Sequence, residues 1–230
     1  MRPLIGVLAL QGDFAEHAKA LTTCGADTIQ VRHSWQLDDL HGLIIPGGES
    51  TTVAKLTSET SDPIFNAIKQ RALAGLPIYG TCMGSIFLAK EIEGSSQGRL
   101  GLMDIKVRRN AFGPQRFSFE TEISIADLGA EPFPAVFIRA PIILSCGPAV
   151  QVMARFGDGI VMARQNNLLV TAFHPEITED LRVHKYFLQM VTDELNRAGD
   201  KAKSVNPMHQ SNSSDHAHAY GKALAGSVSS

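Results

Sequence analysis

The chain has 230 residues, of which 44% are apolar and 19% charged, and its formal net charge is −2. These values are typical of one sizeable globular domain, and the near-neutral charge argues against a protein that binds the phosphates of nucleic acids. The apolar runs are as short as strands, and the first residues lead directly into such a run. We therefore expect a cytoplasmic protein with no membrane segment and no secretory signal.

Strands and helices are expected to alternate through the first half of the chain. Apolar or β-branched runs predict strands, and polar N-caps with later glycines predict the helices between them. The expected strands span residues 4–10, 28–32, 43–45 and 78–79, and the expected helices span 14–24 (capped by Asp13), 63–74 (capped by Asp62) and a segment starting after Cys82. This order predicts an α/β fold of three layers, with a flavodoxin-like, mostly parallel sheet covered by helices on both faces. Ligands of such sheets bind at the carboxyl ends of the strands.

The second half of the chain has a different pattern, with short strand-like segments and few helical ones. These segments span residues 105–107, 117–125, 136–138, 150–154, 160–163 and 168–172. We expect them to add antiparallel strands to the sheet or to form an antiparallel flap. Helical spacing returns from Asp180 to Leu195, with His184 on its apolar side.

From residue 200 onward the composition shifts to Ser, Asn, His, Ala and Gly. A segment so poor in apolar side chains cannot join a core, so we expect one domain over residues 1–199 and a disordered polar tail over 200–230. We interpret the tail histidines as solvated side chains rather than metal ligands.

Gly80-Thr81-Cys82-Met83-Gly84 has the form of a nucleophile elbow. The glycines let a strand and a helix approach closely, and the helix N-terminus favours a thiolate over a thiol. The chain has two other cysteines, Cys24 and Cys146, and this odd number without metal or redox spacing is typical of a reducing compartment. A single cysteine is more often a small buried hydrophobe. The place of Cys82 between an expected strand and an expected helix favours the nucleophile.

Phe173-His174-Pro175-Glu176 follows the expected strand at 168–172. Residues i and i+2 of an extended segment point to the same side, so Glu176 can orient the imidazole of His174. With Cys82 they supply a nucleophile, a base and an orienting group. The alternatives are an ordinary surface turn and a metal pair. A third ligand with sensible spacing is missing from the sequence, so we expect no metal.

Pro46-Gly47-Gly48-Glu49-Ser50 ends the third expected strand. Adjacent glycines let a backbone N–H face a ligand, which is how an oxyanion is held in acyl transfer. An ordinary tight turn explains the same pentapeptide equally well.

Six segments together resemble the glutaminase subunits of the two-component pyridoxal 5'-phosphate synthases, within the class I, triad-type glutamine amidotransferases. They occur in family order at residues 6–12, 46–52, 80–82, 109–113, 137–141 and 173–176. The resemblance covers about residues 4–195. The elbow and His-Pro-Glu are common to the whole class, whereas the segments at 47–52, 109–113 and 138–141 are particular to this subunit.

The resemblance implies hydrolysis of L-glutamine through a thioester on Cys82, with His174 and Glu176 completing the catalytic triad. It also implies that no cofactor is needed and that ammonia passes to a synthase subunit in a hetero-oligomer. The substrate-binding positions that it implies are Gly48, Glu49, Ser50, Arg109, Ile138 and Arg139. The positions implied at the oxyanion site and subunit interface are Gln11, Gly47, Gly48 and Met83. Arginine suits the carboxylate of an amino acid and glutamate suits its ammonium group.

Two residues depart from the family pattern: Met83 replaces a smaller residue, and Pro114 stands where the family usually has arginine. Two other functions remain open. One is a free-standing hydrolase on the same scaffold, such as a γ-glutamyl hydrolase or a peptidase-like relative, against which Arg109 and Arg139 argue. The other is a non-enzymatic binding module, against which the intact set of Cys82, His174 and Glu176 argues.

Overall fold

The computed structural model describes residues 2–10, 12–48, 63–113 and 118–205, and the side chains of the last range as far as residue 200. Residues Met1–Leu195 form one compact unit and Asn196–Ser230 a second, in which the described residues continue helix α5 (Arg182–Val205). The positions of Gln11, Glu49, Ser50 and Pro114 lie outside the described residues.

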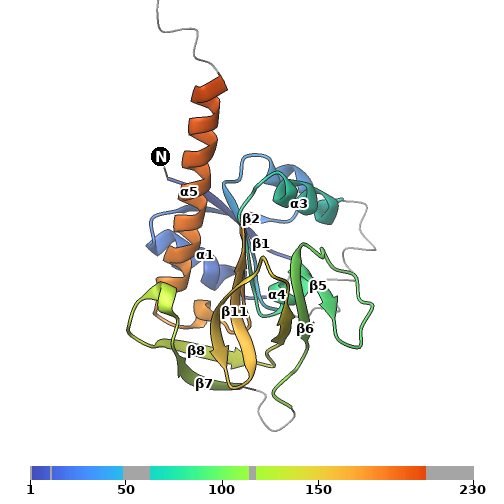
Figure 1. Ribbon diagram of the computed structural model, residues 1–230. Coiled ribbons are helices and arrows are strands. Elements are labelled where there is room, and N and C mark those ends of the chain that lie inside the picture. Colours follow the sequence, from blue (N-terminus) through green and yellow to red (C-terminus); the bar gives the residue numbers. More distant parts are fainter. Residues whose placement is uncertain (1, 11, 49–62, 114–117, 206–230) are drawn as a thin grey trace, which may run out of the picture. The chain divides into compact units, whose positions relative to one another are not determined.

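A large mixed sheet forms the centre of the first unit (Figure 1). Five of its strands lie side by side in parallel, in the order β2 (Asp27–Val31), β1 (Leu4–Leu8), β3 (Gly42–Ile45), β4 (Ile78–Thr81) and β12 (Leu168–Thr171). The sheet then continues through β11 (Gly159–Gln165), β9 (Ile142–Cys146), β6 (Met103–Arg108) and β5 (Ala89–Ile92), while β10 (Gln151–Phe156) pairs with β11. The steps from β12 to β6 are antiparallel, and β5 is parallel to β6. The expected mostly parallel sheet with antiparallel additions is thus confirmed.

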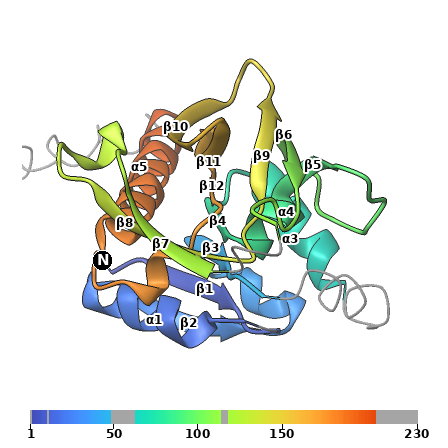
Figure 2. The ribbon, with the colours of Figure 1, turned by 90° about the horizontal axis from the view of Figure 1, so that it is seen from below.

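Helices cover both faces of this sheet (Figures 1 and 2). The alternation of side chains along β3 shows why: Ile44 joins one core cluster, whereas Leu43 and Ile45 join the other. The cluster around Ile44 holds the apolar sides of α1 (Phe14–Thr23) and α5. The cluster around Leu43 and Ile45 holds α3 (Ile64–Leu73) and α4 (Met83–Leu88), together with the 3-10 turn η1 (Ser34–Leu37). Both faces are therefore dry, as a central parallel sheet requires.

A separate antiparallel pair, β7 (Ser118–Ile123) and β8 (Phe133–Ile138), lies on the face that carries α1 and α5 (Figure 2). Its inward side chains Ile123, Phe133 and Phe137 belong to the same core cluster as Phe173. The second half of the chain therefore forms both of the expected structures, antiparallel additions to the sheet and an antiparallel flap. Some segments extend the sheet, and this pair forms a flap; the short turn η2 (Ala126–Leu128) connects its strands.

The helix boundaries agree closely with those expected from the sequence in the first half of the chain, and less well for the last helix. Helices α1 and α3 end within a residue of the expected positions, where Gly25 and Gly75 have φ of 91° and 106°. Helix α5 extends past the expected end at Leu195 to Val205. Among the described residues, none of the helices combines the length and apolar character that crossing a membrane requires.

Candidate active site

Four adjacent parallel strands end at one edge of the sheet, and each is followed by a loop that carries a candidate group. Asp13 comes after β1, Gly47 after β3, Cys82 after β4 and His174 after β12. Strands β4 and β12 pair with Thr81 opposite Thr171. Because Cys82 follows Thr81 directly and His174 comes soon after Thr171, the two side chains emerge beside each other at the carboxyl edge.

Cys82 occupies a sharp turn between β4 and α4. Its backbone has φ of 45°, a conformation that residues with a Cβ rarely adopt, and its side chain is nearly buried. A Cβ on Gly80 would lie 2.6 Å from the backbone of Gly84, and one on Gly84 would lie 2.1 Å from the carbonyl oxygen of Ile45. The strand and the helix thus approach as closely as the elbow pattern predicts, and only glycine fits at either position.

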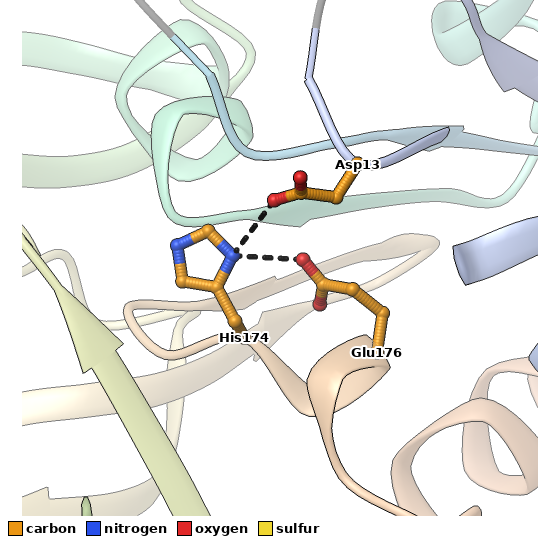
Figure 3. A group of neighbouring side chains, drawn as sticks. All are labelled: Asp13, His174 and Glu176. Carbon is orange, nitrogen blue, oxygen red and sulfur yellow. Dashed lines mark hydrogen bonds and ion pairs between the residues drawn. The ribbon is translucent and has the colours of Figure 1, made fainter. Parts of the chain in front are cut away.

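His174 and Glu176 form a buried hydrogen-bonded pair (Figure 3). His174 Nδ1 lies 2.8 Å from Glu176 Oε1, and the Glu176 side chain is fully buried. The backbone N–H of His174 donates to the carbonyl of Val136 in β8, and Glu176 lies in the short turn η3 (Pro175–Ile177). His174 Nε2 has no hydrogen-bond partner among the described residues. The ring is therefore oriented from its Nδ1 side, and its other nitrogen remains available.

A second carboxylate, that of Asp13, approaches the same ring nitrogen. Asp13 Oδ2 lies 3.5 Å from His174 Nδ1, and 45% of the Asp13 side chain is exposed (Figure 3). The sequence predicts Asp13 as the side-chain cap of α1, and this expectation is wrong: the Asp13 side chain makes no capping hydrogen bond. The structure thus supplies the third potential metal ligand that the sequence lacked, since ligand atoms of Asp13, His174 and Glu176 lie within 4.8 Å of one another.

The glycine loop after β3 packs closely against the imidazole of His174. A Cβ on Gly47 would lie 2.4 Å from His174 Cε1, and a Cβ on Gly12 would lie 1.6 Å from the Gly47 carbonyl oxygen. The backbones of the loops after β1 and β3 are therefore in direct contact, and the loop after β3 contacts the ring of His174. Gly48, the last described residue of this loop, has φ of 155°.

The two segments around Arg109 and Arg139 adjoin the same edge. Ile138 O lies 3.8 Å from Cys82 Sγ, and the N–H of Ala111 donates to the carbonyl of Ala140 at 3.0 Å. Arg139 has φ of 42°. Both arginine side chains are exposed, and the Arg109 guanidinium donates to Gln97 Oε1 at 2.9 Å.

Comparison with known proteins identifies the family. A family model described as the SNO glutamine amidotransferase family matches residues 7–193. The chain belongs to this family. It is 56% identical to pyridoxal 5'-phosphate synthase subunit PdxT of Pelotomaculum thermopropionicum, over 86% of this chain and 98% of that one. It is 57% identical to the PdxT subunit of Desulforamulus reducens, over 82% of this chain and 99% of that one. The resemblance that the sequence motifs indicate is confirmed.

Solved structures agree with this assignment. A crystal structure of a glutamine amidotransferase superposes with a TM-score of 0.77 at 47% identity, covering 82% of this chain and 98% of that one. The structure of PurLQS from Thermotoga maritima, at 18% identity, superposes with a TM-score of 0.60 over 85% of this chain and all of the matched one. This second protein shows that the fold persists at low sequence identity.

Electrostatics favour a protonated His174 in this amidotransferase. Burial by itself lowers the pKa of His174, but Asp13, Cys82 and Glu176 together raise it to about 12. The pKa of Asp13 is lowered, chiefly by its hydrogen bond to His174. Burial raises the pKa of Glu176, and its bond to His174 opposes that effect. The two carboxylates beside Nδ1 therefore favour the imidazolium form of His174.

The side chain of Met83, which departs from the amidotransferase pattern, is buried in the core cluster that packs α3 and α4 against the sheet. The larger side chain is therefore accommodated between helix and sheet. Its backbone N–H is at the first position of α4.

Sequence reasoning missed a buried polar group behind Glu176, formed by His17, His184 and Thr81. His17 lies on α1, four residues after Asp13, on the side that also buries Ala20 and Leu21. The spacing of His17, Ala20 and Leu21 was a signal that the histidine is buried. Its partner in the fold is 167 residues away, which no local pattern reveals.

Proposed function

We propose that the protein hydrolyses L-glutamine to L-glutamate and ammonia as the glutaminase subunit of a pyridoxal 5'-phosphate synthase. The observation that carries the proposal is Cys82 at a strained strand-to-helix turn, beside an imidazole whose Nδ1 is held by the buried Glu176. Relatives more than 50% identical over nearly their whole length are named as pyridoxal 5'-phosphate synthase subunits.

Acylation begins when the thiolate of Cys82 attacks the side-chain amide carbon of glutamine. The carbonyl oxygen becomes an anion, which we propose that the backbone N–H groups of Gly48 and Met83 hold. His174 gives its proton to the amide nitrogen, the C–N bond breaks and ammonia leaves. A thioester on Cys82 and a neutral imidazole remain.

Deacylation uses the same ring as a base. The thioester no longer carries the negative charge that helps to raise the pKa of His174, so the ring can accept a proton from water. The hydroxide attacks the thioester, the C–S bond breaks, and glutamate leaves while the thiolate and the imidazolium are restored. Glu176 keeps Nδ1 bonded throughout, so that Nε2 carries out both proton transfers.

Substrate binding is proposed from the family resemblance and, for the residues that the structure describes, from their position at the same edge. The residues proposed to hold the amino acid are Gly48, Glu49, Ser50, Arg109, Ile138 and Arg139. Ile138 lies against Cys82, whereas Arg109 would exchange Gln97 for the substrate carboxylate. Gln11 and Gly47 are proposed to contribute to the oxyanion site and to the subunit interface.

The ammonia is proposed to pass to a synthase subunit in a cytoplasmic hetero-oligomer that binds neither nucleic acid nor membrane. Residues 1–199 would carry this activity without a cofactor or metal, and the tail at 200–230 would be dispensable. A chelator should therefore leave glutamate formation unchanged, even though Asp13, His174 and Glu176 lie close enough to share a cation.

The experiment that tests the function is glutamate formation at saturating glutamine as the synthase subunit is titrated in. A glutaminase that ran without its acceptor would waste glutamine, so we expect weak activity alone and a rise of roughly a hundredfold with the partner, equivalent to about 2.7 kcal/mol of barrier. Full activity without the synthase and no rise on adding it would establish the free-standing hydrolase instead. No glutamate under any condition would establish a binding module.

A further inference from the structure

A chain of buried polar side chains lies behind the candidate triad. His17 Nδ1 lies 3.0 Å from His184 Nε2, and His17 Nε2 lies 3.1 Å from Thr81 Oγ1 and 3.3 Å from Glu176 Oε2. His17, Thr81 and His184 are completely buried. Buried polar groups of this kind are costly unless they satisfy one another, so the direction of each contact matters.

One arrangement of the ring protons gives more of these buried polar atoms a suitable partner than the reverse arrangement does. If His17 carries its proton on Nε2, this N–H faces Glu176 Oε2 and Thr81 Oγ1, and Nδ1 accepts from His184 Nε2. His184 Nδ1, which has no partner among the described residues, is then a bare lone pair. The reverse arrangement leaves His184 with a buried unpaired N–H and turns the lone pair of His17 toward a carboxylate, both of which cost more free energy.

Both rings must be neutral for this arrangement to hold. Burial lowers the pKa of His17 well below its ordinary value, with further lowering by His184 and His174. Burial also lowers the pKa of His184, to about 4. Near pH 7 the pair therefore acts as oriented dipoles rather than as cations.

We infer that His17, oriented by His184, is a positioning residue that holds Glu176 through its Oε2 while Oε1 orients His174. The inference rests on the proposed function. Helix α1 then fixes the pair from both sides in its first turn, because Asp13 contacts His174 and His17, four residues later, contacts Glu176. Glu176 Oε2 is buried and makes no hydrogen bond of good geometry among the described residues, so its 3.3 Å contact with His17 Nε2 is the polar contact that faces this oxygen.

Two substitutions of His17 separate positioning from packing. The amide of Gln reaches the position of Nε2, whereas the amide of Asn reaches only that of Nδ1. In the complex with the synthase subunit, we expect H17N to lower kcat by roughly tenfold to a hundredfold, the effect of losing a buried N–H that faces a charged group, with KM unchanged. H17Q should restore most of kcat. Y79F is the matched control, because it removes a buried hydroxyl that bonds Thr171 rather than Glu176.

The pH profile supplies a second readout. Glu176 also faces His174, Asp13 and Tyr79, which the His17 variants leave in place. Loss of the His17 donor should therefore move the acid limb of kcat/KM to higher pH in H17N and leave it in place in H17Q and Y79F. Equal loss of kcat in H17N and H17Q, or an unmoved acid limb in H17N, would overturn the inference. A wild-type complex that forms no glutamate would instead remove the proposed function.

A third measurement needs neither a variant nor activity. Long-range proton–nitrogen correlation spectra of the full chain with labelled histidine report the tautomer of each ring. We expect His17 to be neutral with its proton on Nε2 at pH 7. A proton on Nδ1, or an imidazolium, contradicts the inference even if all the variants fail to fold.

Discussion

The two sides of the His174 ring differ in burial although each presents a carboxylate to the same nitrogen. Glu176 is fully buried 2.8 Å from Nδ1, whereas Asp13 is 45% exposed at 3.5 Å. The buried side continues into His17 and His184, and the exposed side continues into the glycine loop at Gly47. Water screens the exposed contact and cannot reach the buried one, so two similar ion pairs should carry very different energetic weight.

The largest effect is expected for replacement of Cys82, the proposed nucleophile beside the His174 ring. Cys82→Ala should abolish glutamate formation in the complex, by at least about a thousandfold, because no other group forms the thioester. Cys24→Ala and Cys146→Ala are the controls, since burial raises the pKa of both thiols and neither lies in an elbow between glycines. Glutamate formation by the Cys82→Ala protein near the wild-type rate would show that Cys82 is not the nucleophile.

The comparison between the two carboxylates is tested directly by isosteric amides. We expect Glu176→Gln to lower kcat by roughly a hundredfold or more, because an amide favours the wrong orientation or tautomer of His174. Asp13→Asn should lower kcat by less than about tenfold, as expected for a screened contact. Equal losses in steady-state assays of the two variants would show that burial does not decide their weight.

The glycine loop gives the next largest effect. Gly47→Ala places a methyl group 2.4 Å from His174 Cε1, so either the ring or the loop must move. We expect kcat to fall by about tenfold to a hundredfold while the protein still folds. Gly98→Ala, where an added Cβ meets nothing within 4 Å, is the matched control. A wild-type kcat in Gly47→Ala would show that the loop can move to accommodate the methyl group without affecting catalysis.

The pKa values of His174 and of His184, on the buried side of the ring, should make the free energy of unfolding depend on pH in opposite directions. The folded pKa of His174 is raised to about 12, so its contribution to stability is complete below about pH 6.5 and is lost as the pH rises toward 12. The folded pKa of His184 is lowered to about 4, so the unfolded state binds its proton first. Stability is then lost as the pH falls from 6.5 to 4, by about 3 kcal/mol. Urea unfolding from pH 4.5 to 9.5 measures both limbs, and His184→Gln should flatten the acid limb alone. An unchanged acid limb in His184→Gln would show that other groups account for it, either His17 or carboxylates such as Asp180, whose pKa values are also lowered.

The smallest effect is expected far from either side of the ring. Truncation from Asp200 onward removes the last turn and a half of α5 and the tail, and the residues just before the cut, at 195–199, are already exposed. We expect the melting temperature to change by less than about 3 °C and glutamate formation to stay constant. A larger drop in either quantity would show that the removed residues contribute to stability or to activity.

Local patterns predicted the parts of the site that lie close together in sequence. The elbow around Cys82 and the i, i+2 pair of His174 and Glu176 are short-range geometry, so residue spacing was enough to predict both arrangements. Asp13 was misassigned because a helix start and a contact to a distant ring use the same carboxylate, and only the fold decides between them. His184 was placed on an apolar helix side without a partner, because its contact to His17 joins residues 167 positions apart in the sequence.

The fold was predictable to the same extent. Strands with continuous apolar runs, such as β3, were found, because a buried parallel strand leaves that signature. Strand β5 was missed because its four residues include Lys90 and Glu91, both exposed, so that it does not resemble a core strand. Strand β9 was missed because it is half exposed at Leu144 and Ser145.

The direct contact between backbone loops at Gly12 and Gly47 has a mechanical consequence. Side chains that separate two loops can absorb a small shift by changing rotamer, but peptide groups in contact cannot. The loop after β1 touches the Gly47 carbonyl, and Gly47 touches the imidazole. A shift of a few tenths of an ångström in the loop after β1 should therefore be passed on to the His174 ring, so these glycines couple that loop rigidly to the proposed base.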